Sequence, residues 1–256
     1  SLLKATLRRY QVFGVKFALA QKRVIVGDEM GLGKTLQALG VLAQRKAEGA
    51  SRFLIVAPAS VLINWTREIE SRTDFEVLRF HGEMQEVALA AWMSGGGLGL
   101  TSFDTLKNLG ITSQQVFELG VDTLIVDEAH FAKNLDTARS REIAKWTARV
   151  ENVVFLTGTP MENRPGEFIQ LTSMVNNELS RKLDITVMNS GPELFKKEVA
   201  PIYVRRNTKE VLQELPELIE IDEYCDWEGV NEDFYRVAVE KGNFMAMRRA
   251  ALMEKP

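Results

Sequence analysis

This chain of 256 residues carries a formal net charge of −3 at pH 7, and 45% of its residues are hydrophobic and 26% charged. That composition is typical of a globular protein with a buried core and excludes a disordered chain. The single cysteine, Cys225, cannot form an intrachain disulfide or a cysteine-based metal site, so we expect a reducing, intracellular environment. The sequence shows no signal-peptide pattern and no apolar run near the ~20 residues that cross a bilayer, so we expect neither a secreted nor a membrane-spanning protein.

Six short apolar runs alternate with stretches of helical spacing. The runs lie at residues 24–26, 53–57, 77–80, 98–101, 123–126 and 153–156. Unbroken apolar strands separated by helices predict a parallel sheet covered on both faces, which is a doubly wound α/β fold that binds its ligands beyond the carboxyl ends of the strands. After residue 172 helical spacing replaces the strand runs. We therefore predict an α/β domain at 1–172 and a helical extension at 173–256.

Charge is distributed unevenly along the chain. Residues 1–52 contain ten basic and three acidic side chains, a local excess of +7, whereas residues 209–240 contain two basic and eleven acidic ones, a local net charge of −9. The basic end could attract a phosphate, a nucleotide or a nucleic acid. Solvated helix faces would explain the same pattern, so charge alone does not identify a partner.

The first predicted strand leads directly into a glycine-rich loop and then a helix. Gly31 and Gly33 would let successive backbone N–H groups point at phosphate oxygens, while Lys34 would reach the β- and γ-phosphates and Thr35 would ligate Mg²⁺. Asp28 occupies the place of the first glycine in the usual pattern, so this is a variant loop. The alternative is a tight strand–helix turn without a ligand. The residues that we expect to line a nucleotide here are Asp28, Glu29, Met30, Gly31, Leu32, Gly33, Lys34 and Thr35.

Two other predicted strands end in polar residues. Asp127 and Glu128 follow the strand at 123–126, where the first could hold Mg²⁺ and the second could orient and deprotonate a water. On its own, such a pair is more often a helix N-terminal charge. Thr157 and Thr159 follow the strand at 153–156 and could contact these carboxylates, although Thr-Gly-Thr-Pro is also simply a good turn.

Together these motifs resemble the Swi/Snf branch of helicase superfamily two. The matching sequence segments are Leu-Arg-Arg-Tyr-Gln at 7–11, Asp-Glu-Met-Gly-Leu-Gly-Lys-Thr at 28–35, Asp-Glu-Ala-His at 127–130 and Leu-Thr-Gly-Thr-Pro at 156–160. The resemblance implies a RecA-like domain of the P-loop NTPase class, with ATP and Mg²⁺ as ligands. It further implies a motor that moves along double-stranded DNA without reading base sequence, in a bacterial cytoplasm or nucleoid or in a eukaryotic nucleus.

The same resemblance implies roles for individual residues. Gln11 would read the adenine edge. The catalytic residues would be Lys34, Asp127 and Glu128, and the metal would be held by Thr35 and Asp127. His130, Thr157 and Thr159 would couple hydrolysis to movement. DNA phosphates would be contacted by Ser60, Thr101 and Ser102. The alternative for Ser60 is a helix cap, and the alternative for Thr101 is an ordinary strand-end residue.

Swi/Snf motors close a second RecA-like domain over the nucleotide, and that domain supplies arginines to the γ-phosphate. No second series of strands and glycine loop follows residue 172. Such arginines are worth ~10³–10⁵ in rate, so we expect this chain alone to bind Mg-nucleotide weakly and to hydrolyse it poorly. Two rival hypotheses remain, a strand-separating DNA or RNA helicase and a non-enzymatic scaffold that binds a protein partner through the acidic segment 209–240.

Overall fold

The computed structural model describes residues 2–134, 136–159, 165–183, 192–211, 230–242 and 246. By its internal contacts the chain divides into two units, residues 1–215 and residues 216–256. Cys225 and most of the acidic segment 209–240 lie outside the described residues. In the second unit the structure describes helix α13 (Val230–Glu240), whose exposed apolar side chains include Phe234 and Val237.

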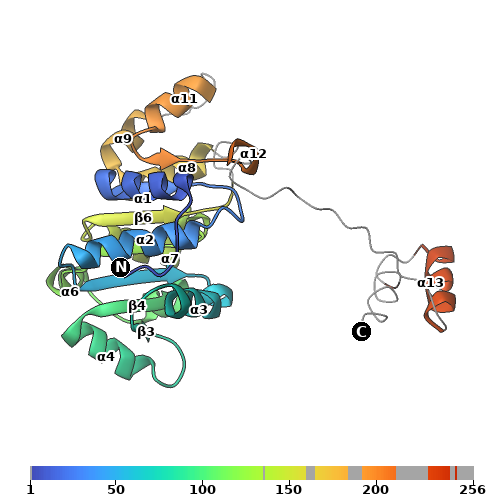
Figure 1. Cartoon of the computed structure of the whole chain (residues 1–256), viewed down its shortest axis with the longest axis horizontal. Helices are drawn as coiled ribbons and strands as arrows, with labels where there is room; N and C mark the ends of the chain where they lie inside the picture. The colour runs from blue at the N-terminus through green and yellow to red at the C-terminus, as the bar shows by residue number, and fades with distance from the viewer. Residues whose placement is uncertain are drawn as a thin grey trace. The chain divides into compact units, whose positions relative to one another are not determined.

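The first unit is built on a sheet of seven strands in the order β3-β4-β2-β5-β6-β1-β7 (Figure 1). Every pairing between these strands is parallel. The strands are β1 (Arg23–Val26), β2 (Arg52–Ala57), β3 (Val77–Arg79), β4 (Gly97–Ser102), β5 (Thr123–Val126), β6 (Asn152–Leu156) and β7 (Tyr203–Val204). The six strands expected from the apolar runs are confirmed, and so is the doubly wound α/β fold.

Helices cover both faces of the sheet, as the apolar runs require. They are α1 (Arg9–Gln21), α2 (Lys34–Ala47), η1 (Ala59–Val61), α3 (Leu62–Arg72), α4 (Gln85–Gly95), α5 (Phe103–Asn108), α6 (Ser113–Leu119), η2 (Ala129–Ala132), α7 (Ala138–Thr147), α8 (Pro165–Val175), α9 (Asn177–Lys182), α11 (Pro192–Val199) and α12 (Thr208–Val211). None of the helices among the described residues is long and apolar enough to cross a membrane.

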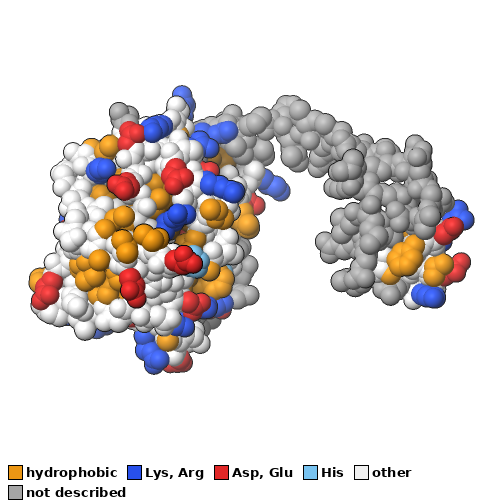
Figure 2. Space-filling model, turned by 90° about the horizontal axis from the view of Figure 1, so that it is seen from below, with side chains coloured by type: hydrophobic (Ala, Val, Ile, Leu, Met, Phe, Trp, Pro, Cys, Tyr) orange, Lys and Arg blue, Asp and Glu red, His pale blue; other side chains and the backbone are white. Residues whose placement is uncertain are grey.

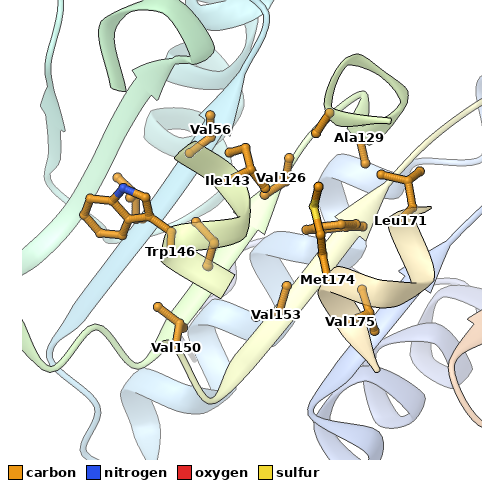
Figure 3. Close-up of a cluster of buried hydrophobic side chains, with 14 of the residues drawn as sticks. Val56, Val126, Ala129, Ile143, Trp146, Val150, Val153, Leu171, Met174 and Val175 are labelled. Atoms are coloured by element: carbon orange, nitrogen blue, oxygen red, sulfur yellow. The ribbon is translucent and has the colours of Figure 1, made fainter. Parts of the chain in front are cut away.

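Successive strand residues feed two separate hydrophobic cores. Val24 and Val26 pack with α1, α2 and α3, whereas Ile25 between them joins the core under α4 to α8. This alternation follows from the two-residue period of a strand. Figure 3 shows the second core, in which Trp146 of α7 and Leu171 of α8 lie over the strands. Because both faces are apolar, only the ends of the strands are free to carry polar chemistry.

The carboxyl-terminal part of the first unit differs from the expected helical extension. Residues 203–204 form β7, which pairs in parallel with β1 and extends the same sheet. The expected boundary at residue 172 falls inside α8, and the first compact unit continues to Leu215. The strand was missed because it has only two residues, both half-buried, and therefore leaves no apolar run in the sequence.

On the face of the first unit shown in Figure 2, acidic and basic side chains are interspersed, with apolar side chains between them. This face of the first unit therefore carries no field of a single sign. The position of the polar loops at the sheet edge is the better guide to function.

Candidate functional site

Three polar loops leave the sheet at one edge, from neighbouring strands. In register, Val26 of β1 lies beside Leu156 of β6, and Phe155 of β6 lies beside Val126 of β5. The loops that follow these strands, at residues 27–35, 127–130 and 157–159, are therefore adjacent. This edge is where open α/β sheets bind their ligands.

The loop at residues 27–35, hereafter the phosphate loop, has the backbone that its glycines predict. Gly31 has φ +86° and Gly33 has φ +72°, values that side chains other than glycine rarely adopt. Gly33 is also the N-cap of α2, so the free N–H groups of that helix point into the loop. Lys34 Nζ folds over the loop and donates to the carbonyl oxygens of Asp28 at 2.7 Å and Glu29 at 3.3 Å.

Charge converges on Lys34 from the neighbouring loops. Burial lowers the pKa of the Lys34 ammonium, and the carboxylates of Glu128, Asp28 and Asp127 oppose that shift. An ammonium held between loop carbonyls and these carboxylates is well placed for an anion that carries its own metal ion. Lys34 therefore lies where the sequence predicts it.

Asp28, which replaces the usual first glycine, has no left-handed φ, so the backbone does not need glycine at this position. Its carboxylate is 0% exposed and is held by the Arg206 guanidinium and by Gln37 Nε2 at 2.9 Å. The Asp28 side chain therefore ties the phosphate loop to Arg206 and Gln37. The neighbouring Met30 is 75% exposed, on the open side.

Helix α1 contacts the phosphate loop through two side chains. Tyr10 Oη donates to the carbonyl of Leu32 at 3.1 Å, and Gln11 Nε2 donates to the same oxygen at 3.2 Å. A Cβ at Gly33 would lie 2.5 Å from Gln11 Nε2, so glycine is needed there for space as well as for φ. Gln11 thus lies at the loop, as the resemblance implies for an adenine-reading residue.

The carboxylate of Asp127 is oriented by two hydrogen bonds. Its Oδ1 accepts from the backbone N–H of Glu128 at 2.8 Å, and its Oδ2 accepts from Trp65 Nε1 at 2.8 Å. A carboxylate has about four acceptor positions, so lone pairs remain for a metal ion. Trp65 is buried like a core residue, but its indole N–H also orients this carboxylate.

Glu128 adopts a backbone conformation that is rare for its residue type, with φ 47° and ψ 50°. Holding a non-glycine residue there costs ~1–3 kcal/mol, and such residues concentrate at functional sites. His130 Nδ1 lies 3.1 Å from Glu128 Oε2, within ion-pair distance but outside hydrogen-bond geometry. His130 thus lies beside Glu128 in the loop after β5.

The loop after β6 closes over the same edge. Thr157 is fully buried and its hydroxyl accepts from the N–H of Thr159 at 3.3 Å. A Cβ on Gly158, between them, would lie 2.9 Å from Met30 Cγ and 3.5 Å from Lys34 Nζ. The two threonines therefore flank a point of close approach to the phosphate loop. Pro160 lies outside the described residues.

The expected DNA-contacting residues differ in their surroundings. Ser60 lies exposed in η1, directly after β2. Ser102 is the N-cap of α5, and its Oγ accepts from the N–H of Thr105 at 3.1 Å. Thr101 lies near the end of β4 and is buried, and its hydroxyl has no hydrogen-bond partner among the described residues. The helix cap considered for Ser60 is therefore found at Ser102 instead, and Ser60 is exposed.

A parallel sheet with a glycine-lysine-threonine loop after one strand and an Asp-Glu pair after another defines a RecA-like P-loop nucleotide-binding domain. The SNF2-related domain family matches residues 10–255, and the chain belongs to this family. Its fold is similar to the "Sulfolobus solfataricus SWI2/SNF2 ATPase core in complex with dsDNA", with a TM-score of 0.71 and 26% identity, covering 94% of this chain and 53% of that one. The family expected from the sequence motifs is thus confirmed.

Two curated relatives illustrate the range of the family. The human DNA annealing helicase and endonuclease ZRANB3 is 30% identical over 241 residues, which are 84% of this chain and 22% of that protein. A Drosophila melanogaster homologue of the SWI/SNF-related chromatin regulator of subfamily A that contains DEAD/H box 1 is 29% identical over 268 residues, or 91% of this chain and 31% of that protein. This chain therefore spans less than a third of these two relatives and about half of the solved ATPase core.

Proposed function

We propose that this chain is the first ATP-binding half of a DNA-dependent, Swi/Snf-type translocase. The observation that carries the proposal is the convergence of Lys34, Asp127 and Glu128, from two neighbouring loops, on one edge of the sheet. Family membership supports ATP as the ligand. A scaffold that had lost its enzymatic role would have no physical need for all three charged groups.

In this proposal each residue of the edge has a task. The N–H groups of the phosphate loop and Lys34 bind the phosphates, and Gln11 contacts the base. Thr35 and the free lone pairs of Asp127 fit Mg²⁺, which supplies positive charge to the phosphates when it is bound. Glu128 orients the attacking water and accepts its proton, while the buried Thr157 and the half-buried Thr159 transmit changes at the phosphates to neighbouring surfaces.

We further propose duplex DNA as the polymer on which the motor acts, bound through its phosphates and without base readout. The solved relative in complex with double-stranded DNA supports this choice. Ser60, exposed in η1 after β2, is the residue that we expect to contact a phosphate. A second RecA-like domain in the same polypeptide would complete the nucleotide site, since this chain spans 53% of that solved core. Such a motor would work inside the cell, wherever its DNA is kept.

The test is Mg-ATP hydrolysis by this chain and by the longest polypeptide that contains it, each with no nucleic acid, duplex DNA, single-stranded DNA or RNA. We expect low turnover by this chain and strong stimulation of the longer polypeptide by duplex alone. Stimulation only by single strands or RNA would favour the strand-separating helicase instead. Protein binding without any hydrolysis would favour the scaffold.

Lys34→Ala and Glu128→Gln should abolish hydrolysis in the longer polypeptide. Matched controls are Lys16→Ala and Glu118→Gln, which make the same chemical changes at exposed positions on α1 and α6. Both controls should retain the original turnover. Equal activity of the site variants and their controls would contradict the assigned roles.

A further inference from the structure

The segment at residues 202–208, hereafter the return segment, runs along β1 and on beside the phosphate loop. The backbone N–H groups of Ile25, Gly27 and Glu29 donate to the carbonyls of Ile202, Val204 and Arg206, at 2.7, 2.7 and 3.0 Å. The pairing ends where the N–H of Thr208 donates to Glu29 Oε2 at 2.6 Å. The first residues of the phosphate loop are therefore held by a segment almost 180 residues away in sequence.

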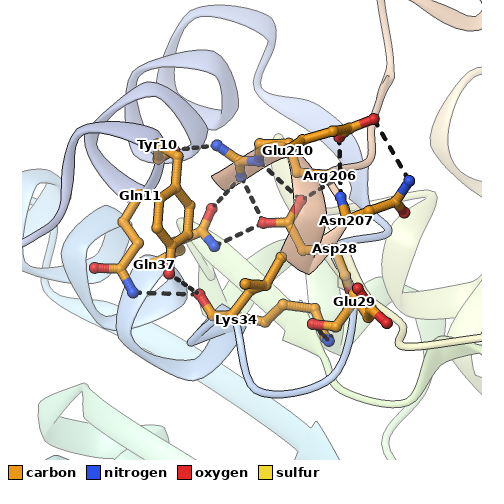
Figure 4. Close-up of polar contacts among 10 residues, drawn as sticks. Tyr10, Gln11, Asp28, Glu29, Lys34, Gln37, Arg206, Asn207 and Glu210 are labelled. Carbon is orange, nitrogen blue, oxygen red and sulfur yellow. Dashed lines mark hydrogen bonds and ion pairs between the residues drawn. The ribbon is translucent and has the colours of Figure 1, made fainter. Parts of the chain in front are cut away.

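Arg206 is the centre of this contact (Figure 4). Its Nε lies 2.9 Å from Asp28 Oδ1 and its Nη2 lies 2.5 Å from Asp28 Oδ2, a two-pronged pairing to a carboxylate that is fully buried. The backbone N–H of Arg206 adds a third donor to Oδ1 at 3.1 Å. The Arg206 side chain is itself only 12% exposed. Paired donors of this kind give a carboxylate both a charge partner and a fixed direction.

The same guanidinium joins two helices to the phosphate loop. Nη1 of Arg206 donates to the carbonyl of Tyr10 in α1, and Nη2 donates to Gln37 Oε1 in α2 at 2.9 Å. The amide of Gln37 in turn donates to Asp28 Oδ2 at 2.9 Å. Since Tyr10 also donates to Leu32, the loop is fixed near both of its ends by one connected network.

Two glycines make room for this network, which is independent evidence for its geometry. A Cβ at Gly14 in α1 would lie 1.9 Å from Gln37 Oε1 and 2.9 Å from Arg206 Nη2. A Cβ at Gly27 would lie 2.5 Å from the ring of Tyr203 in the return segment. Neither glycine has a left-handed φ, so close approach rather than backbone freedom explains both positions.

We propose that Arg206 is a positioning residue of the nucleotide site, which holds the phosphate loop in its phosphate-binding shape through the side chain of Asp28. The usual loop has a glycine in place of Asp28, and therefore no side chain there that could be bound. Here the return segment binds the Asp28 carboxylate through Arg206, so that segment is part of the site. This inference rests on the proposed ATP binding. By linkage, ATP that favours the held loop must also stabilise the return segment.

The experiment compares ATP binding by the 256-residue chain and by its Arg206→Lys variant, using calorimetry with Mg-ATP. Lysine keeps the charge but cannot span both oxygens of Asp28, so we expect at least a tenfold loss of affinity. The matched control is Arg23→Lys, the same change at a half-buried arginine at the amino end of β1, where four main-chain carbonyls accept its donors. The control should bind ATP like the unaltered chain.

A double-mutant cycle with Asp28→Asn tests whether the two residues act as one unit, because their losses should then not add. Binding is measured at a temperature at which circular dichroism shows every variant to be folded. Hydrogen exchange, compared amide by amide with and without ATP, supplies a readout that is local to the return segment. In the unaltered chain ATP should slow exchange of the amides of Arg206 and Thr208, and in Arg206→Lys this protection should disappear.

The outcomes separate the inference from the proposed function. If the unaltered chain binds no ATP, the proposed function fails and the inference fails with it. If the unaltered chain binds ATP and Arg206→Lys binds it equally well, or ATP leaves the return segment unprotected, only the inference is overturned. Equal loss of affinity in Arg206→Lys and Arg23→Lys would assign the effect to general destabilisation and overturn it as well.

Discussion

Replacing Trp65 by phenylalanine removes one hydrogen bond at the proposed metal site. The indole is 2% exposed, and its Nε1 donates to Asp127 Oδ2 at 2.8 Å. A hydrogen bond to a charged group contributes about 1.5–3 kcal/mol. Because Asp127 is only half-buried and water can partly replace the donor, we take the lower half of that range and add a small cost for the lost ring volume. The expected loss is ~2–3 kcal/mol, which lowers Tm by roughly 4–12 °C in a domain of this size.

The second expected effect of Trp65→Phe is on Mg²⁺. With one of its two hydrogen bonds gone, Asp127 is free to rotate, and loss of a group that orients a metal ligand costs ~10–100-fold in metal affinity. We therefore expect about a tenfold rise in the Mg²⁺ concentration that half-saturates ATP binding, the lower end of that range. The assay is a Mg²⁺ titration at fixed ATP, run beside thermal unfolding without nucleotide.

Trp146→Phe is the matched control for this prediction. Trp146 is also fully buried, and its Nε1 donates to a carboxylate, Glu142 Oε1, at 2.9 Å, but from the other face of the sheet. Both variants should unfold at lower temperature, and only Trp65→Phe should need more Mg²⁺. An unchanged Mg²⁺ requirement in Trp65→Phe, or the same rise in Trp146→Phe, would refute the reasoning.

Three further outcomes follow from the contacts. Arg23→Lys should lower the free energy of unfolding by about 2 kcal/mol in urea titrations, because lysine cannot serve the four carbonyls that the guanidinium reaches. Burial raises the pKa of Asp122, but hydrogen bonds from Arg45 and a threonine lower it by more than burial raises it, so the pKa lies below its usual value. The stability that this pairing contributes is present above pH ~4 and is lost on acidification. Asp122→Asn should therefore have a lower free energy of unfolding than the unaltered chain at pH 7, and its free energy of unfolding should change less with pH below pH ~4. Gly33→Ala, with φ +72° and a clash at 2.5 Å, should weaken ATP binding more than tenfold, whereas Gly120→Ala, with φ +59° and open space around it, should only lower Tm.

The sheet could be predicted because its longer strands, apart from the half-buried to exposed edge strand β3, are buried along most of their length. Each then appears as an uninterrupted apolar run, and parallel order follows from the helices between the runs. Parallel order in turn places the loops after β1, β5 and β6 at one edge, so Lys34 and Asp127 could be assigned to one site without coordinates. The sequence pattern of the phosphate loop was also informative, because glycine, lysine and threonine each have a distinct physical role in binding phosphate and Mg²⁺.

The residues that orient the site could not be predicted in the same way. Trp65 lies on a helix with apolar spacing, and burial explains it fully until the direction of its N–H is known. Arg206 looks like one of two surface cations, since nothing local marks a partner 178 positions earlier. Ser102 was predicted to contact a phosphate, but a hydroxyl also suits a helix cap, and only the start of α5 shows that Ser102 caps that helix.

The buried pair of Asp28 and Arg206 has a consequence for where the nucleotide-binding unit ends. A fully buried carboxylate without its cation is strongly unfavourable, and so is a nearly buried guanidinium without its carboxylate. The phosphate loop and the return segment therefore have to fold together, although α8 and α11 lie between them in sequence. A polypeptide that ended near residue 172 would leave Asp28 without Arg206 and one side of β1 without β7. The physical unit that can bind a nucleotide accordingly reaches at least to Thr208.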